Sequence, residues 1–155
     1  MIFVTVGTHT DGFQRLVEAM DRLAPGLDEE VVIQLGATPV QPANARWFRF
    51  TTQDEVDDLC RRARLIVSHA GAGSIMAALR YGKPLIVMPR LKKYGEHLDN
   101  HQTELARVLA DNGTILVAYE AAELPQRLAE AAGFMPRRPD SSCLVEAVRA
   151  AVTAR

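Results

Sequence analysis

Five short apolar runs, each followed by a stretch with helical spacing, constrain this chain more than any other feature of its sequence. They are Ile2–Val6, Val31–Leu35, Leu65–His69, Pro84–Pro89 and Thr114–Ala118. A strand that is apolar along its whole length is typical of a parallel sheet covered on both faces, and strands that alternate with helices indicate an open α/β sheet. The sequence therefore predicts the α/β class, a single Rossmann-like domain with a mainly parallel sheet.

Helical patterns separate these runs and continue to the end of the chain. Apolar residues at helical spacing, closing glycines, and a threonine before an acidic first turn mark where helices begin and end. The expected helices span Phe13–Leu23, Thr52–Ala63, Ser74–Gly82, Asp99–Gly113, Glu123–Ala132 and Leu144–Val152. The last of them, within residues 141–153 or so, is amphipathic enough to dock on this domain or on a partner.

Length and charge exclude several classes of function. The chain has 155 residues, 48% of them hydrophobic, which suits one domain, residues 1–155, with a sizeable core. With 18 basic and 19 acidic residues it lacks the broad positive surface of a nucleic-acid-binding protein. Its apolar runs are strand-sized, far from the ~20 residues of a membrane helix. We therefore expect a cytoplasmic protein in which Cys60 and Cys143 are reduced and unpaired.

The first apolar run ends in a loop, GTHTDG, that precedes a helix. Gly7 lets the backbone approach a ligand, and the positive helix amino terminus that follows suits a phosphate. Gly7, Thr8 and His9 are therefore candidate binding residues. A tight turn with His9 in solvent would have the same sequence. The loop also lacks the three-glycine dinucleotide fingerprint and the lysine of a P-loop.

The stretch SHAGAGS, at the end of the third run, is more specific. Gly71 and Gly73 permit close approach of the backbone, and the free N–H groups at the start of the next helix suit a diphosphate. Ala72 belongs to the same turn, and His69 and Ser74 would donate hydrogen bonds to the same anion. The alternative is a helix cap beside a histidine packed in the core.

Hydrogen-bonding side chains are dense after the fourth run, in PRLKKYGEHLDNHQTELA. His97, Asp99, Asn100, His101 and Gln102 lie within six residues of one another, at the carboxyl end of a strand. This pattern suits the hydroxyls of a sugar. Two histidines four residues apart could instead bind zinc, but the sequence supplies no clear third ligand. A general base among the histidines is a further alternative, with nothing in the sequence to place one against an acceptor.

Three stretches in this order, VTVGTH...F.RLVE..D, SHAGAGSI..AL..GKPLIVMPR and GEH.DNHQ.ELA, resemble the C-terminal-domain family of glycosyltransferase family 28. The likeness runs from Ile2 to about Ala106. It is strongest to short members of the family, the small subunits of two-component UDP-sugar glycosyltransferases. These include bacterial exopolysaccharide glucuronosyltransferases and the eukaryotic dolichol-linked N-acetylglucosaminyltransferase.

The resemblance implies the C-terminal, donor-binding half of a GT-B glycosyltransferase. It places the diphosphate of a UDP-sugar on the turn Gly71–Ser74, with His69 beside it to stabilise the departing UDP. It places His101 and Gln102 on the donor sugar. The residues expected to bind the donor are Gly7, Thr8, His9, His69, Gly71, Ala72, Gly73, Ser74, Glu96, His97, Asp99, Asn100, His101 and Gln102. No metal and no cofactor are expected, since the helix dipole and these side chains would offset the charge of the diphosphate.

The resemblance also implies a partner. In two-domain relatives the catalytic base comes from the N-terminal domain, so we expect a membrane-anchored subunit that supplies the acceptor site and the base. The pair would transfer a sugar, with inversion, to a polyprenyl-diphosphate-linked acceptor. This would place the chain at the inner face of the plasma membrane, peripheral through its partner.

One departure from the family pattern leaves a second function open. Relatives commonly have a glutamate for the ribose hydroxyls where this chain has Ala77. A non-catalytic nucleotide-sugar-binding or regulatory module is therefore the alternative. A dinucleotide-dependent oxidoreductase is disfavoured, because the second run ends in QLG rather than an acidic residue. From the resemblance we expect the sugar to be glucuronic acid or N-acetylglucosamine, and Arg90, Lys92 or Lys93 could contact the carboxylate of the former.

Overall fold

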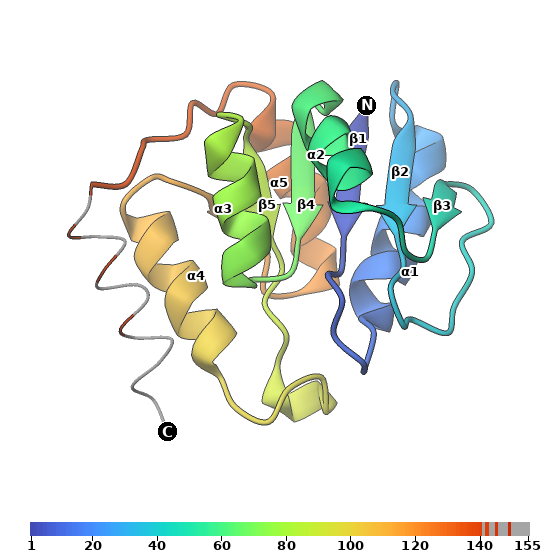
Figure 1. Cartoon of the computed structure of the whole chain (residues 1–155), viewed down its shortest axis with the longest axis horizontal. Helices are drawn as coiled ribbons and strands as arrows, with labels where there is room; N and C mark the ends of the chain where they lie inside the picture. The colour runs from blue at the N-terminus through green and yellow to red at the C-terminus, as the bar shows by residue number, and fades with distance from the viewer. Residues whose placement is uncertain (141, 143–144, 146–148, 150–155) are drawn as a thin grey trace.

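The computed structural model describes residues 1–140, 142, 145 and 149, and its centre is one parallel sheet (Figure 1). In the described residues the sheet has six strands in the order β3-β2-β1-β4-β5-β6, every neighbouring pair parallel. The strands are β1 (Ile2–Thr5), β2 (Val31–Gln34), β3 (Arg46–Phe48), β4 (Leu65–Ser68), β5 (Leu85–Val87) and β6 (Leu116–Val117). The predicted fold class is confirmed.

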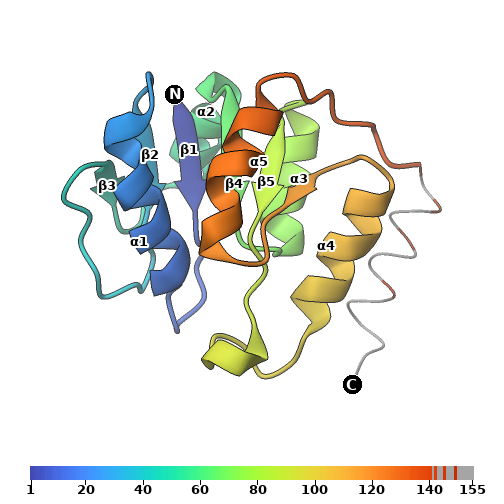
Figure 2. The same ribbon diagram turned by 180° about the vertical axis from the view of Figure 1, so that it is seen from behind.

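Helices cover both faces of this sheet, as the views from front and back show (Figures 1 and 2). α1 (Gln14–Leu23) and α5 (Leu124–Ala131) lie on one face. The other is covered by α2 (Gln53–Arg62), α3 (Ala72–Arg80) and α4 (His101–Asp111). Short 3-10 turns are η1 (Ala24–Gly26), η2 (Lys92–Tyr94) and η3 (Ala121–Glu123). The predicted helix over 144–152 lies almost wholly outside the described residues.

Side-chain alternation along the strands divides the core in two. Ile2 and Val4 of β1 pack with Leu16 and Leu128 on the α1/α5 face. Phe3, between them in sequence, packs with the α2–α4 face. Because both faces are buried, β1, β2 and β4 are apolar at nearly every position, the property from which the parallel sheet was predicted.

Two details of the predicted elements are wrong. The apolar runs end later than the strands, because Val6 and Leu35 stay buried after the chain has left the sheet. The chain then turns at Gly7 and Gly36, both with positive φ. In addition, β3 was not expected as a strand. It lies at the edge of the sheet and two of its three residues are exposed, so it lacks the apolar run that marks a buried strand.

The strand order creates a crevice at the carboxyl ends of the strands. From β1 the chain proceeds outward to β2 and β3 on one side, then returns to β4 and proceeds to β5 and β6 on the other. The loop after β1 leads to α1 on one face, and the loop after β4 leads to α3 on the opposite face. Neighbouring strands whose loops diverge in this way form the usual ligand crevice of an open α/β sheet, at their carboxyl ends.

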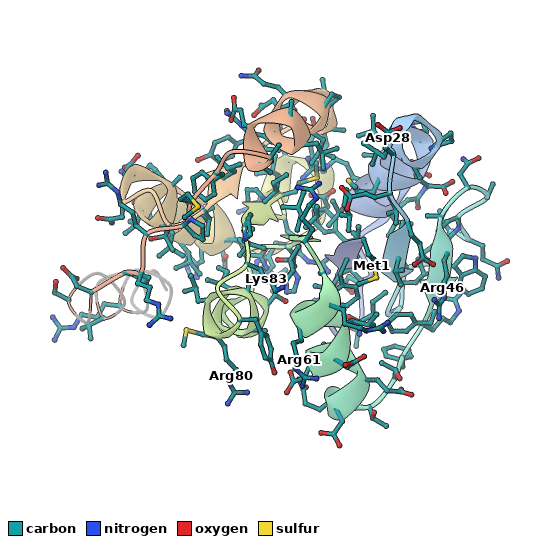
Figure 3. The ribbon with its side chains drawn as sticks, turned by 90° about the horizontal axis from the view of Figure 1, so that it is seen from above. Met1, Asp28, Arg46, Arg61, Arg80 and Lys83 are labelled. Carbon is teal, nitrogen blue, oxygen red and sulfur yellow. The ribbon has the colours of Figure 1, made fainter. Side chains whose placement is uncertain are left out.

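Met1 lies at the opposite end of the sheet, where the strands begin. Figure 3 looks onto this end, with Met1 near the centre and Asp28, Arg46, Arg61, Arg80 and Lys83 around it. The ammonium group of Met1 lies 2.9 Å from a carboxylate oxygen of Glu29, which also pairs with Arg64. These contacts fix the start of β1 against the strand on either side.

Candidate functional site

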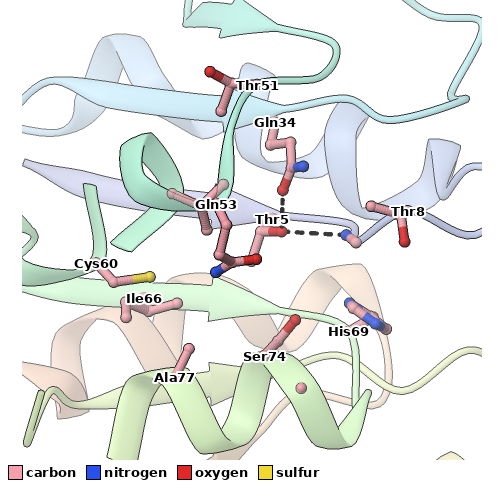
Figure 4. Close-up of a pocket in the computed structure, with 13 residues that line it drawn as sticks. Thr5, Thr8, Gln34, Thr51, Gln53, Cys60, Ile66, His69, Ser74 and Ala77 are labelled. Carbon is pink, nitrogen blue, oxygen red and sulfur yellow. Dashed lines mark hydrogen bonds between the residues drawn. The ribbon is translucent and has the colours of Figure 1, made fainter. Parts of the chain in front are cut away.

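A pocket of about 400 Å³ lies at the carboxyl ends of β1 and β4, where the loops diverge (Figure 4). Its lining comes from both strands and the loops after them, from β2, and from α2 and α3. The residues are Thr5, Gly7, Thr8, Gln34, Thr51, Gln53, Val56, Cys60, Ile66, His69, Gly73, Ser74 and Ala77. Five of the fourteen predicted donor-binding residues are in this lining: Gly7, Thr8, His69, Gly73 and Ser74.

His69 follows β4 directly, and its imidazole lies between two glycines. A Cβ on Gly7 would come within 2.6 Å of Cε1 of His69, and a Cβ on Gly71 would overlap Nε2 of the same ring. Gly7 also has a φ of +72°, which side chains with a Cβ rarely adopt. These two glycines are therefore required by the packing of His69.

The imidazole of His69 is neutral at physiological pH. Burial is the largest cause that lowers its pKa, and together with the charges of Arg90, His9 and His97 it brings the pKa to about 4. Its Nδ1 is buried near the backbone of Thr5 without a hydrogen bond of good geometry to any described residue. His69 can therefore stabilise an anion by a hydrogen bond, but not by a positive charge.

The amino terminus of α3 opens into the pocket. Its N-cap is Gly71, and no side chain in the described part of the chain caps it. The first N–H groups of the helix therefore stay available, with the positive end of the helix dipole behind them. A Cβ on Gly73 would meet none of the described atoms within 4 Å, so a ligand has room to approach the backbone. Together these features would suit the binding of an anion, which stays a prediction.

The strand ends provide a polar floor that the sequence analysis missed. Thr5 donates a hydrogen bond from Oγ1 to Oε1 of Gln34 at 2.5 Å, and the N–H of Gly7 donates to the same Thr5 oxygen at 3.2 Å (Figure 4). Thr5 is 6% exposed and Gln34 5%. The sequence contains a signal for this polar floor: Thr5 and Gln34 are polar residues in otherwise apolar strands, at positions that are usually apolar in a parallel sheet.

The opposite wall comes from α2 and α3. Thr51 and Gln53 flank the start of α2, whose N-cap is Thr52, as the sequence predicted; the structure adds a capping box between Thr52 and Glu55. Beside them lies Cys60, whose thiol is kept protonated because burial and then the charge of Asp57 raise its pKa to about 11. It forms no disulfide among the described residues. Cys143 lies outside the described residues.

The histidine-rich segment contributes no residue to the lining of this pocket, but it approaches the loop after β1, which does. The ring centroids of His97 and His9 are 6.1 Å apart. The Asp99 carboxylate lies between two histidines, 3.1 Å from Nδ1 of His97 and 3.4 Å from Nδ1 of His101. The N–H of His101 donates to Asp99, which lowers the pKa of this carboxyl group. In the described part of the chain, no group of histidine, cysteine and carboxylate side chains is arranged to hold a metal ion.

Two further predicted donor-binding residues, Glu96 and Gln102, also have intramolecular partners in the structure. Both oxygens of the Glu96 carboxylate lie 2.8 Å from the guanidinium group of Arg15. Oε1 of Gln102 accepts a hydrogen bond from the backbone N–H of Arg90 at 3.0 Å. Ala72 and Asn100 are exposed at the starts of α3 and α4. Contact of all fourteen predicted residues with a donor, including the five in the pocket lining, stays a prediction.

One candidate for a basic surface contact is wrong. Arg90 is 1% exposed, and its guanidinium group donates to the carbonyl oxygens of Val6 and Gly12 inside the protein. Its charge cannot meet the sugar of a bound ligand at the surface. Lys93 is exposed but pairs with Glu120 at 2.5 Å. Lys92 is exposed as well.

The family model of the glycosyltransferase family 28 C-terminal domain matches residues 1–138. The chain belongs to this family. The match extends beyond the three motifs, to the end of α5 and the segment after it. Among the described residues of this family 28 domain, none of the helices has both the length and the apolar character needed to cross a membrane.

Two kinds of relative illustrate the likeness in sequence. The chain is 35% identical over 122 residues to the human UDP-N-acetylglucosamine transferase subunit ALG13, and the aligned region covers 72% of this chain and 10% of ALG13. It is 33% identical over 86 residues to a Rhodospirillum rubrum N-acetylglucosamine transferase that acts on N-acetylmuramyl-(pentapeptide) pyrophosphoryl-undecaprenol, covering 56% of this chain and 21% of the relative. The family 28 domain thus spans a tenth to a fifth of these proteins.

Solved structures show the same fold at low identity. An NMR structure of ALG13 has a TM-score of 0.63 and 21% identity, covering 99% of this chain and 95% of that one. Acinetobacter baumannii MurG has a TM-score of 0.59 and 19% identity, covering 97% of this chain and 45% of MurG. The likeness confirms the predicted architecture, equivalent to one half of a GT-B glycosyltransferase.

Proposed function

We propose that this chain is the donor-binding subunit of an inverting glycosyltransferase that uses a UDP-sugar. The observation behind the proposal is the pocket between β1 and β4. In a member of family 28, this pocket combines the uncapped amino terminus of α3, the open backbone at Gly73 and the neutral imidazole of His69. No metal or cofactor is part of the proposal, because the helix dipole and hydrogen bonds suit a diphosphate.

In the proposed reaction the diphosphate is the leaving group. The acceptor hydroxyl attacks the anomeric carbon from the face opposite UDP, the bond from that carbon to the diphosphate oxygen breaks, and a base takes the hydroxyl proton. The first turn of α3 and His69 would stabilise the negative charge that develops on UDP. His69 would do so as a hydrogen-bond donor, since its lowered pKa keeps it neutral.

N-acetylglucosamine is the donor sugar we favour, with glucuronic acid as the alternative. The human and Rhodospirillum relatives are both named as N-acetylglucosamine transferases. A buried Arg90 removes one of the three basic residues that could pair with a glucuronate. For the acceptor we propose a polyprenyl-diphosphate-linked sugar, by analogy with the undecaprenol substrate in the name of the Rhodospirillum relative.

A partner completes the proposed enzyme. The human relative is named as a subunit, and MurG-like relatives are more than twice as long as the part they share with this chain. We propose a membrane-anchored subunit that supplies the acceptor site and the base. The family 28 domain would be cytoplasmic and peripheral to the inner face of the plasma membrane through this subunit.

One observation favours a second candidate function, a non-catalytic nucleotide-sugar-binding or regulatory module. Ala77 presents only a methyl group to the pocket, and none of its described lining residues is a carboxylate that could bind ribose hydroxyls. Such a module would bind UDP yet transfer no sugar with any partner.

The test is a calorimetric titration of the full chain with UDP, UDP-N-acetylglucosamine, UDP-glucuronic acid and NAD. We expect binding of UDP and its sugars but not of NAD, and weaker binding in His69→Gln. Glu130→Gln, in the exposed surface of α5, is the matched control. Absence of UDP binding at millimolar concentration, or equal binding by His69→Gln, contradicts the proposal. Transfer assays with candidate partners then separate the enzyme from the module.

A further inference from the structure

The histidine-rich segment is fastened at both ends to the same short turn after β5. The N–H of Arg90 donates to Oε1 of Gln102 at 3.0 Å, and the N–H of Leu91 donates to Oε2 of Glu96 at 2.9 Å. The five residues between, 97–101, therefore begin and end at adjacent backbone amides. Their path at the mouth of the pocket depends on these two contacts.

The contact at Glu96 is reinforced from α1. Nε and Nη2 of Arg15 each lie 2.8 Å from a different oxygen of the Glu96 carboxylate, a bidentate pair whose side chains are 16% and 13% exposed. The same guanidinium group donates to the carbonyl oxygens of Tyr119 at 2.8 Å and Pro89 at 3.0 Å. Arg15 thus joins α1, the end of β5 and the chain after β6 to one carboxylate.

The same turn also holds the other loop of the site. The side chain of Arg90 reaches the carbonyl oxygens of Val6 and Gly12, which begin and end the loop that contains Gly7, Thr8 and His9. The loop after β1 and the segment 97–101 therefore share one anchor. This explains how His9 and His97 come within 6.1 Å, although 88 positions separate them.

The hydrogen bonds that the Glu96 carboxylate accepts in the structure come from other groups of the protein. Both carboxylate oxygens face Arg15, and one of them also accepts from Leu91. A direct contact with a ligand would have to break a largely buried bidentate ion pair. Glu96 is therefore better suited to position its neighbours than to touch the donor.

We propose that the Arg15–Glu96 pair positions the segment 97–101 over the pocket mouth, where that segment contacts the sugar of a nucleotide sugar. Glu96 and Arg15 are positioning residues in this role. The inference rests on the proposed function for its ligand. It predicts that the pair affects the recognition of the sugar while leaving the recognition of the nucleotide unchanged, because the nucleotide pocket is lined by neither residue.

The test uses the full chain and the variants Arg15→Gln, Glu96→Gln, their double variant and Arg15→Lys. Glu104→Gln is the matched control, since Glu104 forms an exposed ion pair with Arg107 on α4. The first measurement is amide hydrogen exchange of residues 97–101 without ligand. The second is the ratio of the dissociation constants of UDP and UDP-N-acetylglucosamine, which isolates the contribution of the sugar.

We expect faster exchange at 97–101 in Arg15→Gln and Glu96→Gln, and a sugar contribution about tenfold smaller, with unchanged affinity for UDP. The double variant is expected to be no worse than either single one, and Arg15→Lys to recover part of the loss. Unchanged exchange, additive losses, or equal losses for UDP and its sugar would overturn the inference. If the wild type binds no UDP, the proposed function is wrong. Hydrogen exchange at residues 97–101 then still tests whether the Arg15–Glu96 pair positions this segment.

Discussion

The imidazole of His69 rests directly on the α-carbon of Gly7, so that the loop after β1 and the turn after β4 are in contact at the site. A Cβ at Gly7 would lie 2.6 Å from Cε1 of His69, a distance that real Cβ atoms do not show. The same ring excludes a Cβ at Gly71, whereas Gly73 has open space. Gly7 and Gly71 therefore lack a side chain because the His69 ring leaves no space for one, whereas Gly73 leaves space that a ligand could use.

The first prediction separates these reasons. Gly7→Ala and Gly71→Ala must displace the His69 ring, and we expect each to lower the free energy of unfolding by about 1–3 kcal/mol. Gly73→Ala has space and ordinary φ, so the fold should keep its stability or gain a few tenths of a kcal/mol. Its new methyl group would instead occupy the approach to the α3 amino terminus and weaken UDP binding. Urea unfolding and UDP titration of the three variants measure both effects.

A destabilised Gly73→Ala protein, or one that binds UDP as well as the wild type, would contradict this division. A stable Gly7→Ala protein would show that His69 has room to move.

The second prediction concerns acid. The folded-state pKa of His69, about 4, is below the ordinary value of 6.5. Between these two pH values the imidazole is protonated in the unfolded chain but not in the folded chain. His69 therefore contributes stability that is fully present above pH 6.5 and is lost as pH falls toward 4, by up to about 3 kcal/mol. His69→Gln should flatten this part of the stability profile between pH 6.5 and 4. Parallel profiles for the wild type and the variant would show that His69 titrates normally.

Much of the fold could be predicted from the sequence, because burial on both faces leaves a direct mark on composition. β1, β2 and β4 were predicted from their apolar runs, and the start of α2 from its threonine cap and acidic first turn. β3 could not be found in this way. It is an edge strand whose exposed Arg46 and Trp47 obey no buried-strand pattern, and only pairing with β2 makes it a strand.

The site was predictable where backbone geometry determines the sequence and not where tertiary contacts do. The glycine turn at 71–74 has a local signature. The polar floor of Thr5 and Gln34 depends on two strands that are adjacent only in the folded sheet. The inward role of Arg90 depends on carbonyl groups 84 and 78 positions away, so its sequence neighbours Lys92 and Lys93 suggested a surface role instead.

The third prediction follows from the buried position of Arg90. Arg90→Met would keep much of the side-chain volume but leave the carbonyl groups of Val6 and Gly12 without their donor. We expect the free energy of unfolding to fall by about 2–4 kcal/mol, since a buried polar group left unpaired costs about 1–3 kcal/mol. Lys92→Met, at an exposed position two residues away, is the control and should change stability by less than about 0.5 kcal/mol. Thermal and urea unfolding give both values, and equal effects of the two substitutions would contradict the assignment.

The last prediction restores a carboxylate to the pocket. Ala77 lies on α3 in the pocket wall, on the same helix as Gly73 and Ser74. The resemblance implies that relatives commonly have a glutamate where this chain has Ala77, and that this glutamate binds the ribose hydroxyls. If UDP occupies the pocket with its diphosphate at the amino terminus of α3, Ala77→Glu should strengthen UDP binding about tenfold, because hydrogen bonds to a charged group contribute about 1.5–3 kcal/mol. The gain should be smaller for Ala77→Gln, which has the shape without the charge, and smaller for 2′-deoxy-UDP, which lacks one of the hydroxyls. Calorimetric titration of both variants with both nucleotides measures the four affinities. An Ala77→Glu protein that binds UDP no better than the wild type, or that gains equally for the deoxy nucleotide, would show that the ribose lies elsewhere in the pocket.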